Sequence, residues 1–151
     1  MEFTLRPARE SDRTYIQRLN YLTEVFGDES APLSESSLRG VNEYVDQWDP
    51  LRDGGVIAFD PYRTPAGGVW LRHWASPEQG FANLCPDVPE LAIAVENRFA
   101  GHALGTRCFG PLATSPGPRG RGASPCSSTR TTPGRGTATK LSGLTTPPPT
   151  T

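Results

Sequence analysis

Long apolar runs are missing from this chain of 151 residues, of which 35% are hydrophobic. A membrane-spanning helix needs about 20 consecutive apolar residues, and no stretch of the sequence comes close to that length. The opening residues, MEFTLRPARESD, carry charge from the second position, where a secretory signal has an apolar core. We therefore expect a cytoplasmic protein that does not enter a membrane, and its size predicts one domain.

Cysteine and histidine are scarce as well. The three cysteines, Cys85, Cys108 and Cys126, lie far apart and form no C-x-x-C pair, and the two histidines, His73 and His102, are isolated. A structural zinc site needs about four such ligands, usually in closely spaced pairs. The sequence therefore predicts no metal site and, in the cytoplasm, reduced thiols.

Acidic residues are missing from the last third of the chain. All 16 lie before position 107, whereas residues 107–151 contain six Lys or Arg, so the two parts carry net charges of −7 and +6. In the same segment, 30 of the 45 residues are Pro, Gly, Ser or Thr. Such a composition buries too little apolar surface to offset the entropy lost on ordering, so we expect residues 107–151 to be a disordered tail.

A basic tail suggests one hypothesis for function, namely a small non-catalytic domain whose tail binds nucleic acid or a protein partner. The tail has a sparse Arg-Gly pattern around Arg119 and Arg121. RNA-binding tails of this kind usually interleave aromatic residues that stack on bases, and Phe109 is the one aromatic residue in this tail. The composition therefore argues against nucleic acid as the partner.

The first 106 residues show regular hydrophobic patterns. Alternation of apolar and polar residues predicts a strand over residues 3–6. Apolar residues that recur three or four positions apart predict a helix over residues 12–25, capped by Ser11, and a second helix that Pro50 closes. This part of the chain is therefore expected to hold the folded domain.

Three further strands follow the second helix. The run VIAFD after Gly54 and a second run over residues 68–74, separated by turn-forming residues, predict a hairpin. Residues 90–95, ELAIAV, are almost wholly apolar, which is typical of a strand buried on both faces. A turn and the start of a helix come next. The expected fold is mixed α/β, an α+β arrangement around one mixed sheet, in the order β-α-α-β-β-β-α up to about residue 108, with the hairpin and central strand antiparallel.

A short motif follows the expected central strand. Arg98, Gly101 and Ala103 match the pattern Q/R-x-x-G-x-G/A, which resembles the acetyl-CoA-binding signature of the GNAT superfamily of N-acetyltransferases. The opening strand, the amphipathic helix, the hairpin and the strand before the motif match that family in order and spacing. The resemblance covers residues 1–106 and implies a GNAT domain, incomplete at its C-terminal side, followed by the tail 107–151. The alternative is an ordinary strand-to-helix turn with convenient glycines.

The resemblance implies acetyl-CoA as co-substrate. The free N–H groups at the start of a helix and the helix dipole favour a pyrophosphate there, and small residues let it approach. The backbone of the preceding strand contacts the pantetheine arm in the family, and His102 is expected to add a donor to a phosphate. The residues implied in cofactor binding are Ile93, Ala94, Val95, Arg98, Phe99, Ala100, Gly101, His102, Ala103, Gly105 and Thr106.

The resemblance also implies a reaction, in which the amine of a small-molecule or peptide acceptor attacks the thioester. A carboxylate on the central strand often removes the proton, and Glu90 is the candidate for that base. The alternative for Glu90 is a solvent-facing carboxylate at a strand end. Trp74 is expected to be core or sheet-face material, with the lining of an acceptor cleft as the alternative. The acceptor and the oligomeric state stay open, a homodimer being one alternative.

The change of composition after Thr106 suggests a shifted reading frame. When the codons are read one base earlier, the segment from Cys126 to Thr146 allows a run that contains RYEALGF. That run resembles the family's late helix, whose tyrosine protonates the leaving thiolate, whereas this chain has no tyrosine after Tyr62. We therefore expect the tail to be out of frame, and the acetyltransferase to be impaired or inactive as written.

Overall fold

A computed structural model of the chain describes residues 1–76, 78–80, 88–113 and 138–142. Its elements, in chain order, are β1 (Thr4–Pro7), η1 (Glu10–Asp12), α1 (Arg13–Glu24), α2 (Glu35–Val41), η2 (Asn42–Asp46), β2 (Gly55–Phe59), β3 (Pro65–Arg72), β4 (Glu90–Val95), η3 (Asn97–Phe99), α3 (Leu104–Ala113) and β5 (Ala138–Ser142). The main elements up to α3 follow the order β-α-α-β-β-β-α, which confirms the expected mixed α/β fold.

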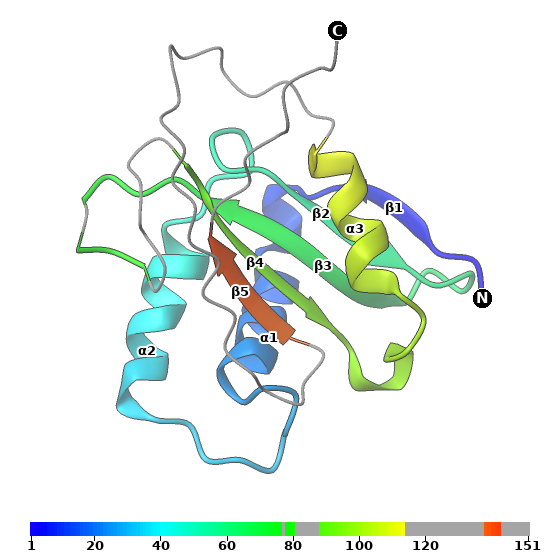
Figure 1. Cartoon of the computed structure of the whole chain (residues 1–151), viewed down its shortest axis with the longest axis horizontal. Helices are drawn as coiled ribbons and strands as arrows, with labels where there is room; N and C mark the ends of the chain where they lie inside the picture. Colours follow the sequence, from blue (N-terminus) through cyan, green and yellow to red (C-terminus); the bar gives the residue numbers. More distant parts are fainter. Residues whose placement is uncertain (77, 81–87, 114–137, 143–151) are drawn as a thin grey trace, which may run out of the picture.

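The strands form one antiparallel sheet in the order β1-β2-β3-β4-β5. Helix α1 lies behind the sheet and α3 crosses its front, while α2 stands beside the sheet near the start of β4 (Figure 1). In the centre of the sheet, Trp70 of β3 lies opposite Gly55 of β2 and Ala92 of β4. The sheet is therefore the middle layer, with helices on both of its faces.

Alternating residues of the strands fill two separate cores, one on each face. The core between the sheet and α1, α2 and η2 contains Ala8, Ile16, Leu19, Leu22, Tyr44, Val45, Trp48, Ile57, Trp70, Ala92 and Ala94. The core under α3 contains Phe3, Val56, Ala58, Ala66, Val69, Leu91, Val95, Phe99, Leu104 and Cys108. Strand β4 contributes to both cores, as expected for a strand buried on both faces, and it occupies residues 90–95 as predicted.

Helix α1 begins at a different residue from the one expected. The predicted cap was Ser11, but the carboxylate of Asp12 accepts the backbone N–H of Arg9 at 2.8 Å and the guanidinium of Arg6 at 2.7 Å. A short 3-10 turn, Glu10–Asp12, precedes the helix. The helix ends where Gly27, at φ +78°, donates its N–H to the carbonyl of Leu22 at 2.9 Å.

The second strand of the hairpin starts earlier than expected. The prediction placed it at residues 68–74, whereas β3 spans Pro65–Arg72. Gly67 and Gly68 lie inside the strand, at positions where the neighbouring atoms leave no room for a side chain. A Cβ at Gly67 would lie 2.8 Å from the carbonyl oxygen of Ala94, and one at Gly68 would lie 2.8 Å from Cδ1 of Ile57. These glycines allow close approach in the sheet and do not break the strand.

Two parts of the expected disordered tail have regular structure. Helix α3 was expected to reach about residue 108 but continues through Pro111 to Ala113, and residues 138–142 form β5. A proline in the last turn removes one backbone donor only, and α3 is held by the buried Leu104 and Cys108. Strand β5 forms because the open edge of β4 offers backbone donors and acceptors to any extended segment. The remaining tail residues lie outside the described ranges.

Candidate functional site

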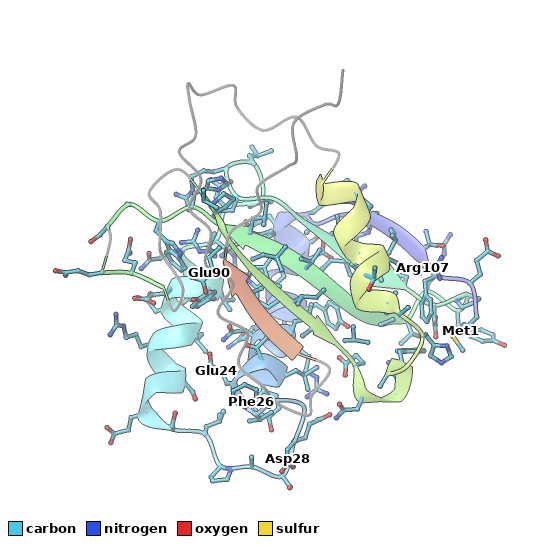
Figure 2. The ribbon with its side chains drawn as sticks, in the orientation of Figure 1. Met1, Glu24, Phe26, Asp28, Glu90 and Arg107 are labelled. Carbon is cyan, nitrogen blue, oxygen red and sulfur yellow. The ribbon has the colours of Figure 1, made fainter. Side chains whose placement is uncertain are left out.

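The residues expected to act on substrate lie at the two ends of β4. Glu90 is its first residue, and the motif Arg98–Ala103 follows its last. At the usual rise per residue these ends are about 16 Å apart. Figure 2 shows Glu90 near the top of α2 and Arg107 at the opposite end, on α3. One strand therefore connects the candidate base to the candidate cofactor site.

The carboxylate of Glu90 is buried, with only 1% of the residue exposed. Its Oε1 accepts the hydroxyl of Tyr44 at 2.5 Å, and its Oε2 accepts Nε1 of Trp74 at 3.0 Å. The rings of Tyr44 and Trp74 meet edge to face, with centroids 5.1 Å apart. The alternative that Glu90 faces solvent is therefore wrong, because a tyrosine and a tryptophan cover it. Sequence patterns indicated Tyr44 only as part of an apolar helix face.

A π-helical turn, η2, presents Tyr44 to Glu90. The second helix was expected as one continuous helix, but α2 stops at Val41 and the chain continues with wider π-type turns. Such turns leave carbonyls that need other partners, and they are frequent at functional sites. Side chains from two other elements, β3 and α1, donate to successive carbonyls here: Arg72 to Glu43, Trp70 to Tyr44 and Arg13 to Val45.

The turn after β4 contains two residues in the left-handed region. Gly101 has φ +83°, and within the described residues no atom other than those of its chain neighbours lies within 4 Å of the position that its Cβ would take. Ala103 has φ +52°, which is strained for a residue with a side chain. Arg98 and His102 are exposed on the same turn. The open space at Gly101 is what a phosphate group needs for close approach to a backbone.

The predicted residues that flank the turn have mixed roles. Phe99 is buried and meets Phe3 edge to face, with centroids 5.6 Å apart, so its ring anchors the turn in the core. A Cβ at Gly105 would lie 3.3 Å from Cδ1 of Ile93, so the missing side chain lets α3 pack closely on β4. Thr106 is exposed at the start of α3. Phe99 and Gly105 are therefore needed for packing, whether or not a ligand binds at the motif.

Side chains that can donate hydrogen bonds to an anion gather around the start of α3. Arg98, His102 and Arg107 are all exposed there, and the ring of His102 and the guanidinium of Arg107 both lie against Phe3. The first N–H groups of a helix have no partner within it, and the helix dipole adds partial positive charge. Arg107 was not among the residues expected to bind the cofactor, because it is the first residue of the low-complexity segment. Together these groups favour an anion.

The outer edge of β4 carries β5. Glu90 lies opposite Ser142, Ile93 opposite Thr139 and Ala94 opposite Ala138 in an antiparallel ladder. Ile93 and Ala94 belong to the strand backbone that was expected to contact a pantetheine arm. Within the described ranges, an extended ligand that paired with residues 90–94 would therefore compete with β5.

No protein-family profile and no curated protein matches this sequence. Among solved structures, the chain is similar to the histone acetyltransferase HPA2 and related acetyltransferase from Corynebacterium glutamicum. The two share 14% sequence identity and superpose with a TM-score of 0.51 over 74% of this chain and 70% of that one.

The chain has the GNAT acetyltransferase fold.

A second solved structure, yncA from Salmonella typhimurium with its cofactor acetyl-CoA, matches with 15% identity and a TM-score of 0.48 over 75% of this chain and 62% of that one. At 14% identity, the similarity to the first of these structures shows the fold alone. Within the described residues, no helix has the length and apolar character needed to cross a membrane, and no group of three or more His, Cys, Asp or Glu side chains could hold a metal.

Proposed function

We propose that this protein is an N-acetyltransferase that moves an acetyl group from acetyl-CoA to the primary amine of a small molecule or peptide. The proposal rests on two features that lie at the two ends of β4 in this GNAT fold. Its first residue is the buried carboxylate Glu90, and the turn after its last residue has the open Gly101 in front of α3. A base and an anion site on one strand suit a thioester donor that carries phosphates.

The proposed reaction needs little covalent chemistry from the protein. The acceptor nitrogen attacks the thioester carbonyl carbon, the C–N bond forms, and the C–S pair leaves with the thiolate. Glu90 removes the proton from the nitrogen. The first N–H groups of α3, together with Arg98 and His102, hold the pyrophosphate. Positioning dominates such a reaction, since an error of about 1 Å in a reacting pair costs on the order of a hundredfold in rate.

The same proposal holds that the chain as written is impaired. Strand β5 pairs with residues 90–94, the stretch of β4 that includes the base and the backbone proposed to bind pantetheine. In addition, no tyrosine follows Tyr62, so a late-helix tyrosine is not present to protonate the thiolate. Both features lower turnover, and the first also weakens acetyl-CoA binding.

We further propose that the segment from Arg107 onward is read out of frame. Its composition and the helix-interior Pro111 support this, because a proline and neighbouring Gly110 are poor choices for a helix that packs on a sheet. The nucleotide sequence is the test. A single-base change near the codon of Thr106 should open a frame that encodes RYEALGF, and a nucleotide sequence that offers no such frame would overturn the frameshift account.

The experiment on function is a thiol-release assay with a panel of primary amines, run on this chain and on its frame-restored form. We expect the restored form to be active and Glu90→Gln to lower its kcat by about a hundredfold or more. Glu96→Gln is the control, because Glu96 follows β4 directly but binds Arg18 instead. If the restored form neither binds acetyl-CoA nor releases thiol with any amine, the proposed function is wrong.

A further inference from the structure

Tyr44 has a relation to Glu90 that the GNAT resemblance did not supply. Its hydroxyl, in η2, donates to Oε1 of Glu90, in β4, at 2.5 Å. The two residues are 46 positions apart in sequence. We propose that Tyr44 is a positioning residue, which holds the Glu90 carboxylate in the orientation needed to accept the acceptor's proton. The proposal rests on the proposed function for the role of Glu90 as base.

Two donors from different elements restrain the carboxylate. Tyr44 of η2 binds Oε1, and Trp74, just beyond β3, binds Oε2 at 3.0 Å. A single hydrogen bond leaves a carboxylate able to rotate about its Cγ–Cδ bond, whereas one bond to each oxygen sets the plane of the group. Hydrogen bonds to a charged acceptor are also roughly twice as strong as neutral ones. The orientation of Glu90 therefore depends on Tyr44 and Trp74 together.

Tyr44 is itself held firmly, which a positioning residue requires. It is only 2% exposed, and its ring packs edge to face on the Trp74 ring. Its carbonyl accepts Nε1 of Trp70 at 3.0 Å, and the preceding carbonyl, of Glu43, accepts Nε of Arg72 at 2.7 Å. Trp70 and Arg72 belong to β3, which pairs with β4, so the sheet that carries Glu90 also fixes the turn that carries Tyr44.

The chemical step assigns each proton and electron pair. As the acceptor nitrogen forms its bond to the carbonyl carbon, its proton moves to a carboxylate oxygen of Glu90. The C–S electron pair leaves with the thiolate, which takes a proton from solvent. Tyr44 keeps its own proton throughout and acts only on the direction of the carboxylate. Its loss should therefore lower kcat and leave the KM for acetyl-CoA unchanged, because the phosphate turn lies at the other end of β4.

The test compares Tyr44→Phe with Tyr21→Phe. Tyr44→Phe keeps the ring and its contact with Trp74 and removes only the hydroxyl. Tyr21→Phe is the matched control, because its hydroxyl also donates one hydrogen bond, to the carbonyl of Glu29 at 3.0 Å, away from Glu90. The readout is solvent exchange of the Trp74 indole proton in the whole chain, followed by NMR, which needs no enzymatic activity.

We expect the indole proton of Trp74 to exchange about tenfold faster in Tyr44→Phe, since a carboxylate with one restraint turns away from it, and to be unchanged in Tyr21→Phe. An unchanged exchange rate in Tyr44→Phe would overturn the proposal. In the frame-restored form we expect kcat to fall about tenfold at constant KM, and a rise in KM alone would also overturn it.

Failure of the proposed function gives a different result. If Glu90→Gln in the frame-restored form transfers acetyl groups as well as the restored form itself does, Glu90 is not the base. Faster exchange at Trp74 in Tyr44→Phe would then still establish that Tyr44 orients Glu90. A second variant, Trp74→Phe, tests whether lost stability accounts for the effect. It removes the hydrogen bond to Oε2, which is the other restraint on the carboxylate. It should lower kcat by a similar factor while the far-ultraviolet circular dichroism stays unchanged.

Discussion

Arg72 and Asp53 form a buried ion pair beside the candidate base. Nη1 of Arg72 donates to Oδ2 of Asp53 at 2.5 Å, and the two side chains are 2% and 0% exposed. Burial of Asp53 works against its ionisation, but hydrogen bonds from His73, Arg52 and the backbone N–H groups of Asp49 and His73 outweigh it and hold the pKa of Asp53 well below its usual range. This pair links β3 to the turn before β2.

Asp53 should make the protein sensitive to acid. A carboxyl group whose pKa is lowered in the folded state contributes stability above its unfolded pKa of about 4 and loses that contribution as the pH falls further. Asp53→Asn should cost about 3 to 5 kcal/mol at pH 7, because it leaves Arg72 buried without its counter-charge. Urea unfolding at pH 7 and pH 3 measures both effects. The exposed Asp46→Asn is the control, and equal stability of Asp53→Asn and the unaltered chain at pH 7 would contradict the prediction.

Gly101 should be required for binding of acetyl-CoA. Gly101→Glu places a carboxylate in the open space where the phosphates are proposed to lie, so we expect binding measured by calorimetry to weaken by at least about tenfold. Gly54→Glu is a matched control, since Gly54 also has a positive φ, +76°, and also has open space around its Cβ position. Both variants suffer a similar backbone strain of about 1 kcal/mol. Equal binding by the two variants would remove Gly101 from the site.

Strand β5 should compete with acetyl-CoA for the edge of β4. The double variant Thr139→Pro with Leu141→Pro removes two backbone donors from β5, and proline is poorly tolerated in a paired strand. We expect acetyl-CoA to bind the double variant about tenfold more tightly than the unaltered chain. Leu5→Pro in β1 serves as control, because it weakens the opposite edge strand. Unchanged or weaker binding in the double variant would show that β5 does not cover the site.

Cys108 should be unreactive in the folded protein. It is a residue of α3 whose side chain is completely buried in the core, and burial raises the pKa of its thiol to about 11, although nearby Arg107 lowers it in part. At pH 8 only about a thousandth of such a thiol is the reactive thiolate. Alkylation followed by mass spectrometry of the peptide that contains Cys108 should detect modification in urea and almost none without it. Rapid labelling of Cys108 in the folded chain would contradict the packing of α3.

Local sequence patterns were sufficient for the order of the elements. The central strand at residues 90–95 was located to the residue, because six successive residues without a turn former, bounded by Pro89 and Glu96, allow few other structures. The termination of α1 just before Gly27 and the antiparallel hairpin follow from local rules of helix termination and turn formation. The motif Arg98–Ala103 was visible for the same reason, since its glycine and small residues stand next to one another in the chain.

Contacts between distant segments were decided only in the tertiary structure. Glu90 and Tyr44 meet because η2 packs against one face of the sheet to which β4 belongs. A periodic apolar pattern does not distinguish a core tyrosine from one that binds a carboxylate. Gly67 and Gly68 belong to β3 because of the atoms on neighbouring strands, and β5 depends on the free edge of β4. Within residues 1–106, the sequence by itself determined which segments are helix or strand, since those preferences are local. Which side chains surround Glu90, and what covers the edge of β4, depends on packing between segments far apart in the chain.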